Sequence, residues 1–115
     1  MDDFVLRGNL FEIYGGLLKE NQQRASEYHI IDDMSFTEIG EEMGISRQAA
    51  QELFNRADRR LRETEQVLGL SEKLIRIRTL AQQLSEETGD PAAQRLSAEI
   101  IREVSGNGKE RIDGV

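Results

Sequence analysis

Arginine and glutamine side chains lie close together in one short stretch of this 115-residue chain, at Arg47, Gln48 and Gln51. Arginine makes paired hydrogen bonds to guanine and glutamine makes them to adenine, so these residue types suit the reading of base edges. The same stretch holds polar and cationic side chains that suit contacts with phosphate: Ser46, Asn55, Arg56, Arg59 and Arg60. The pattern predicts a surface for double-stranded DNA, whereas the structural alternative is a solvated helix face.

Residues 36–55 provide the elements that would position these side chains, as two helices joined by a turn. Ser35 and Glu38 form a capping box, in which each side chain satisfies a backbone donor at a helix start. Gly44 stands where the first helix must end, because glycine readily adopts the left-handed conformation required there. Ser46 can then cap the second helix.

The apolar residues of this stretch support the same arrangement. Ile39 and Met43 lie four residues apart on the first helix, and Gly40 leaves room for another segment to approach. The inward positions of the second helix are spaced by three and four residues and are Ala50, Leu53 and Phe54. This is typical of a helix-turn-helix, whose second helix lies in the DNA major groove. Two ordinary helices joined by a glycine turn are the alternative.

The charge of the chain limits how it could bind nucleic acid. Fifteen Lys and Arg residues stand against 22 Asp and Glu residues, giving a net charge of −7 at pH 7. Since phosphate neutralisation supplies most non-specific affinity, binding over the whole protein surface is disfavoured. Residues 47–62, however, hold five arginines against Glu52 and Asp58, a local excess of positive charge. The one concentrated basic patch therefore coincides with the predicted recognition helix.

The composition predicts an all-α fold, with a helix-turn-helix core of three to four helices, a long recognition helix and a C-terminal helical hairpin. Helix-forming residues are abundant and there is one proline. Residues 1–70 would form the helix-turn-helix domain, and 71–104 the hairpin, as part of the same compact unit or as a dimerisation element. Residues 105–115 read as a disordered tail. The hairpin has more apolar surface than a lone helix pair can hide, so we expect a homodimer.

Helical periodicity and capping residues predict where each helix begins and ends. The expected caps outside the capping box are Asn21, Ser46, Ser71 and Asp90. The expected helices outside the turn region cover residues 4–18, 22 to about 31, 46–68, 72–87 and 91–104.

No residue pattern predicts catalysis, a cofactor or a metal site. The chain has no cysteine, and His29 is its only histidine, so we interpret His29 as a packing or surface residue. The Asp32-Asp33 pair lacks the ligand spacing of a calcium loop and reads as a polar turn. No apolar run reaches the roughly 18 residues of a membrane span. The acidic N-terminus does not resemble a signal peptide, so a cytoplasmic protein is expected.

Several segments of residues 10–70 together carry a family resemblance. They are Leu10 to Leu18, Gln23-Arg24, Tyr28, Asp32-Asp33, Ser35 to Gly40, Ile45 to Ala49 and Leu68 to Leu70. This combination resembles the YlxM-type family of bacterial helix-turn-helix proteins, and it is similar to the promoter-reading C-terminal domain of sigma factors. The resemblance implies a small cytoplasmic α-helical protein, often encoded beside the signal recognition particle protein Ffh, with a regulatory role in that secretion pathway. The chain departs from the family pattern at Ala50 and Gln51.

Two functions compete at this point. The first is a DNA-binding regulator of transcription that uses the residues named above. The second is a protein-interaction module that binds signal recognition particle components or RNA polymerase without sequence-specific DNA binding, which the net negative charge and Glu52 favour. RNA binding through the same arginines is less favoured, because the sequence lacks exposed aromatics that would stack on unpaired bases.

Overall fold

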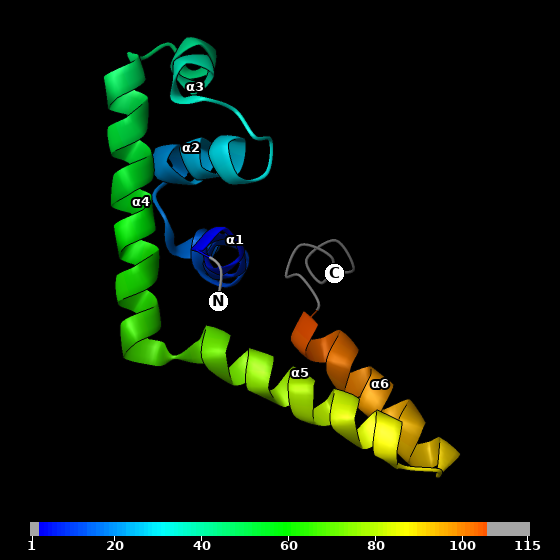
Figure 1. The fold of residues 1–115 in the computed structure, drawn as a ribbon. Coiled ribbons are helices and arrows are strands. Elements are labelled where there is room, and N and C mark those ends of the chain that lie inside the picture. The colour runs from blue at the N-terminus through cyan, green and yellow to red at the C-terminus, as the bar shows by residue number, and fades with distance from the viewer. Residues whose placement is uncertain (1–2, 106–115) are drawn as a thin grey trace. The chain divides into compact units, whose positions relative to one another are not determined.

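The computed structural model describes residues 3–105, and within this range the chain forms helices without any strand. The elements are α1 (Asp3–Tyr14), the 3₁₀ helix η1 (Gly15–Leu17), α2 (Glu20–Ile30), α3 (Phe36–Met43), α4 (Arg47–Leu68), α5 (Leu70–Glu87) and α6 (Pro91–Ser105). Figure 1 shows their arrangement along the chain. The predicted all-α fold, with a helix-turn-helix, a long recognition helix and a C-terminal hairpin, is confirmed.

The chain divides into two compact units at the junction between Leu68 and Gly69. The first unit contains α1 to α4 and the second contains α5 and α6. In the first unit α1, α2 and α3 lie along one side of α4, with α3 beside its beginning and α1 beside its end (Figure 1). The long helix therefore serves as the common packing partner of the other three.

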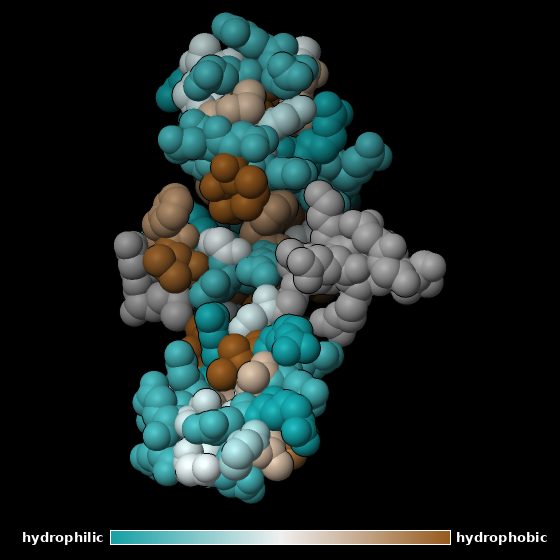
Figure 2. Space-filling view, turned by 90° about the vertical axis from the view of Figure 1, so that its right-hand side faces the viewer, coloured by the Kyte–Doolittle hydropathy of each residue, from teal (hydrophilic) through white to brown (hydrophobic). Residues whose placement is uncertain are grey.

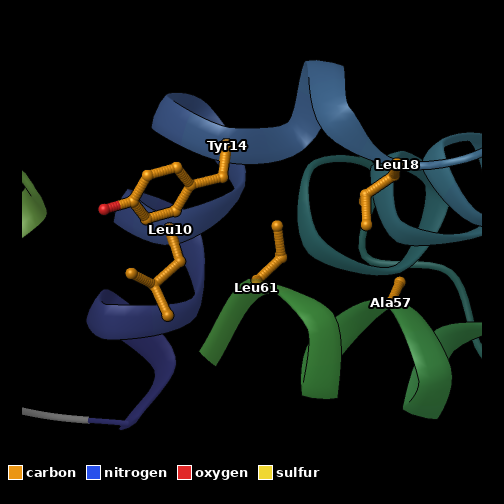
Figure 3. Close-up of a cluster of buried hydrophobic side chains, with 5 residues drawn as sticks. All are labelled: Leu10, Tyr14, Leu18, Ala57 and Leu61. Carbon is orange, nitrogen blue, oxygen red and sulfur yellow. The ribbon is translucent and has the colours of Figure 1, made fainter. Parts of the chain in front are cut away.

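Two clusters of buried side chains hold the first unit together. One joins the end of α1 and the residue after η1 to the middle of α4, and consists of Leu10, Tyr14, Leu18, Ala57 and Leu61 (Figure 3). The other is centred on Ala25 of α2, Ile39 of α3 and Ala50 of α4, which are all fully buried. Burial of such aliphatic groups is the main favourable term in folding, so α4 is fixed against all three neighbours.

His29 packs inside the first unit. Its ring stacks on Phe36 with centroids 4.5 Å apart and meets the edge of Phe54 at 4.5 Å. Its Nδ1 also lies 2.9 Å from the carbonyl oxygen of Met34. These contacts tie the end of α2 to α3 and α4, in agreement with the packing role predicted for this residue.

Three sequence-based helix boundaries were wrong, and buried residues or glycines explain each of them. The first helix ends at Tyr14 instead of residue 18, because η1 follows it and Leu18 takes an extended conformation with its side chain in the core. The second helix then starts at Glu20 with Lys19 as N-cap, so Asn21 does not cap it.

The third boundary lies between α4 and α5. Gly69 takes a left-handed conformation with φ of 61°, which allows α5 to begin at Leu70 with only Gly69 between it and the end of α4 at Leu68. Ser71, the predicted cap, is buried inside the first turn of α5.

The second unit is a pair of antiparallel helices. The predicted start of α6 is confirmed, since Asp90 Oδ1 accepts a hydrogen bond of 3.1 Å from the amide of Ala92 and Pro91 is the first helical residue. The helix continues through Ser105, so the predicted tail over 105–115 was wrong at its first residue, and its other residues, 106–115, lie outside the described residues. Of the described helices, none is both long and apolar enough to cross a membrane.

Candidate nucleic-acid interface

The start of α3 is fixed by the predicted capping box, which is confirmed. The hydroxyl of Ser35 accepts a hydrogen bond of 3.1 Å from the amide of Glu38, and the Glu38 carboxylate accepts one of 3.0 Å from the amide of Ser35. The hydrogen bond from the backbone of Ser35 holds the pKa of Glu38 below its usual value. The hydrogen bonds with Ser35 thus favour the charged form of the Glu38 carboxylate and fix the beginning of α3.

The turn between α3 and α4 depends on two glycines. Gly44 adopts the left-handed conformation with φ of 71° and ends α3 as predicted. Gly40 lies against the turn so closely that a Cβ at this position would be 2.7 Å from the carbonyl oxygen of Ile45 and 3.1 Å from the carbonyl group of Ser46. The turn is therefore packed directly onto α3, which sets the direction in which α4 leaves it.

The solvent-facing surface of α4 follows from its buried side. Ala50, Phe54, Ala57 and Leu61 are buried, and at about 100° per residue they form one stripe along the helix. The opposite stripe is polar and exposed, and it consists of Gln48, Glu52, Asn55 and Arg59. We call these four residues the outer stripe of α4.

The remaining candidate residues lie on the two flanks of α4. Arg47 and Gln51 follow one flank, where Arg47 is exposed and Gln51 is half-buried. Arg56 and Arg60 follow the opposite flank and are exposed. The structure thus brings Gln48, Asn55 and Arg59 together on the outer stripe, and separates the other four candidates on α4 into two pairs.

Ser46 performs the capping function that its position predicted. Its hydroxyl accepts a hydrogen bond of 3.0 Å from the amide of Ala49, and its carbonyl oxygen accepts one of 3.0 Å from the amide of Ala50. The side chain is exposed, so the hydroxyl proton can still be donated to a neighbouring acceptor such as a phosphate oxygen.

The five arginines of α4 differ in how they are engaged. Arg62 binds Asp58 at 3.0 Å and Asp3 at 2.9 Å, and it links α4 to α1. Arg56 binds Glu52 at 2.7 Å in a pair whose side chains are both about 60% exposed. Such exposed pairs contribute at most about 1 kcal/mol, so Arg56 can exchange its partner at small cost.

The other three arginines of α4 are available for a ligand. Within residues 3–105, Arg47, Arg59 and Arg60 have no ion-pair partner. The charge excess found in the sequence is therefore carried mainly by these three side chains.

A groove with a volume of about 390 Å³ lies beside the Arg56 flank, between α4 and the start of α2. It is lined by Leu17, Lys19, Gln22, Arg56, Arg59, Arg60 and Glu63. Lys19 and Gln22 were not predicted as site residues. No local sequence signal marks them, because they reach the arginines of α4 only through the packing of α2 against that helix.

The described part of the chain offers no arrangement for metal chemistry. Among residues 3–105, no group of three or more His, Asp or Glu side chains is placed to hold a metal ion. The surface of α4 instead offers hydrogen-bond donors, amides and cationic groups. These groups suit recognition of an anionic polymer with polar edges.

Comparisons with known proteins identify the family of this chain. Residues 3–101 match a family model described as "Putative helix-turn-helix protein, YlxM / p13 like". The chain is 33% identical over 110 residues to a UPF0122 protein of Thermoanaerobacter sp. (strain X514), covering 90% of this chain and 94% of the relative. It is 38% identical over 104 residues to a UPF0122 protein of Shouchella clausii, covering 89% and 95%. A UPF0122 protein of Symbiobacterium thermophilum is 37% identical over 95 residues, covering 81% and 89%.

Proposed function

Because the chain belongs to the YlxM/p13-like family of helix-turn-helix proteins, we propose that it is a non-enzymatic regulator of transcription that binds duplex DNA in the cytoplasm. The observation that carries this proposal is the polar outer stripe of α4, which begins directly after the α3–α4 turn. In a helix-turn-helix the second helix enters the major groove with its N-terminal residues at the base edges.

The placement of the side chains suits a helix lying between two phosphate backbones. Arg47, Gln48 and Gln51 belong to the first turns of α4 and would reach base edges. The groups assigned to phosphate are Ser46, Asn55, Arg56, Arg59 and Arg60. In this arrangement the flank that carries Arg56 and Arg60 faces one DNA strand, and the first turn of the outer stripe, at Gln48, faces the groove floor.

A salt titration of binding to random duplex DNA tests the proposal. We expect binding to weaken steeply with salt in the wild type, and to fall in the Arg47→Ala/Gln48→Ala variant. The matched control is Arg78→Ala/Gln82→Ala, which removes two exposed residues of the same types from α5 and should leave binding unchanged. Equal affinity of both variants would exclude the assignment of the first turn of α4.

We further propose that the protein is a homodimer that self-associates through the second unit. The side chains buried in the α5–α6 pair are small, namely Ser71, Ala81 and Ser97. Large apolar side chains stay exposed to about 40–54%, namely Ile77, Leu80, Leu84, Leu96 and Ile100. Hydrophobic residues are also visible at the molecular surface in Figure 2. The pair therefore lacks a large-residue core of its own.

These apolar side chains lie on one face of the hairpin. At about 100° per residue, Ile77, Leu80 and Leu84 follow one flank of α5, next to the side that packs on α6. Leu96 and Ile100 follow the corresponding flank of α6. Because the two helices are antiparallel (Figure 1), these flanks come to the same face of the pair.

A second copy of this chain is the partner that fits this apolar face. It presents the same apolar face, and two hairpins together would form a four-helix arrangement with large residues inside. A two-fold dimer would also place two copies of α4 on a DNA site with two-fold symmetry.

The second candidate function is a protein-interaction module, with signal recognition particle components or RNA polymerase as partners. The net charge of −7 and the Arg56–Glu52 pair favour it, because both weaken the attraction of phosphate. Co-purification of such a partner, together with no retention of DNA at low salt, would favour this function over DNA binding.

A further inference from the structure

We infer that the groove between the start of α2 and the middle of α4 binds the DNA backbone, so that Lys19 and Gln22 contact phosphate together with Arg56, Arg59 and Arg60. This inference rests on the proposed DNA binding and adds residues outside the helix-turn-helix motif to the interface. It assigns the groove to a phosphodiester group of one strand rather than to a base.

Charge is the first argument. The groove is lined by four cationic side chains and by one acidic residue, Glu63, in a chain whose net charge is −7. Within the described range, Lys19, Arg59 and Arg60 have no ion-pair partner, and all three are exposed. Cations that converge on one concave surface repel one another, and a bound phosphate would relieve that repulsion.

Position is the second argument. Arg59 belongs both to the outer stripe of α4 and to the lining of the groove. DNA whose major groove receives the outer stripe therefore passes one of its backbones over the flank with Arg56 and Arg60. The groove opens at this flank, and contacts to phosphate from outside the recognition helix are what fixes a protein in register on the duplex.

The start of α2 contributes to the same surface. Lys19 is the N-cap residue of α2, and no side chain caps this helix end. The first amides of a helix lack intrahelical acceptors and carry partial positive charge, which favours an anion nearby. Glu20 in this first turn opposes that effect, so we assign the main attraction to the cationic side chains.

Salt titrations with random duplex DNA test this inference in the full chain. We expect Lys19→Gln to make the dependence of log K on log salt shallower by about 0.9, the amount for one phosphate contact. If affinities converge at 1 M salt, binding at 0.1 M becomes roughly eight-fold weaker. Gln22→Ala should weaken binding without changing the slope, and Lys19→Arg should keep the wild-type slope.

The controls distinguish the inference from the proposed function. Lys73→Gln removes an exposed lysine from α5 and should keep the wild-type slope. An unchanged slope in Lys19→Gln, with binding lost in Arg47→Ala/Gln48→Ala, would overturn the groove alone. No binding by the wild type at low salt would overturn both. Thermal unfolding of each variant verifies that these substitutions leave the fold intact.

Discussion

At the scale of single residues, Gly40 shows how strongly one side-chain position can constrain the interface. A methyl group there would lie 2.7 Å from the carbonyl oxygen of Ile45, and the other near atoms also belong to the backbone of the turn. Backbone atoms cannot rotate away as a flexible side chain can. The absence of a side chain at Gly40 is therefore what permits the direct contact between α3 and the turn.

We expect Gly40→Ala to destabilise the protein by about 1–3 kcal/mol, the usual cost of overpacking. Urea unfolding followed by circular dichroism measures this. The control is Gly8→Ala in α1, where no atom other than the adjoining residues and the backbone of its own helix lies within 4 Å of the added Cβ, and alanine favours the helix by up to about 1 kcal/mol. Equal stability of the two variants would show that the backbone of the turn shifts to accommodate a methyl group at position 40.

At the scale of elements, ion pairs attach α1 to the side of α4. Arg62 donates a hydrogen bond of 2.9 Å to Asp3, and Arg7 lies 3.3 Å from Asp58. The hydrogen bond and the charge of Arg62 hold the pKa of Asp3 below its usual value. Because the folded-state pKa is lowered, this contact stabilises the fold above the unfolded value of 3.8 and is lost as the pH falls through the folded value.

We therefore expect Arg62→Gln to move the pKa of Asp3 up towards 3.8. The difference in stability between wild type and variant should shrink as the pH falls below about 3.8. An NMR titration of the Asp3 carboxyl group measures the first effect, and urea unfolding between pH 3 and 7 measures the second. Arg59→Gln on the outer stripe of the same helix is the matched control and should leave Asp3 unchanged.

The sequence predicted those elements whose ends depend on local chemistry. Ser35 with Glu38, Gly44, and Asp90 with Pro91 mark helix ends through hydrogen bonds or backbone preferences within a few residues, and the structure has each of them. The bend at Leu18 was missed because it depends on burial against α4, which is distant in sequence.

The same difference between local pattern and tertiary packing decides which features of the candidate interface the sequence could predict. The inward positions Ala50, Leu53 and Phe54 followed from helical spacing, and the structure has Ala50 and Phe54 buried and Leu53 half-buried. That spacing also separates Arg47 from Arg56, although both had been assigned to one surface. The engagement of Arg62 by α1, and the groove beside Lys19, follow from tertiary packing and could not be read from local pattern.

At the scale of the whole molecule, the proposed homodimer joins the functions of the two units. The first unit offers the proposed DNA-binding surface, where three arginines of α4 have no ion-pair partner within residues 3–105, and this small number limits the electrostatic affinity of a single copy. The second unit offers an apolar face without large buried residues. Two copies joined through the second unit would double the number of phosphate contacts, although the charge of each first unit stays the same.

We expect the wild-type protein to sediment as a dimer, and Leu80→Lys/Leu84→Lys to sediment as a monomer with unchanged helix content. A charge in the centre of an apolar interface leaves an unpaired buried group, which the association energy cannot offset. The matched control is Ile75→Lys, because Ile75 is also partly exposed on α5 but lies on the opposite flank. A monomeric wild type, or loss of the dimer in the control alone, would contradict the assignment of this face. If two copies bind one DNA site, the monomeric variant should also show about half the salt dependence of the wild type, since it would contact half as many phosphates.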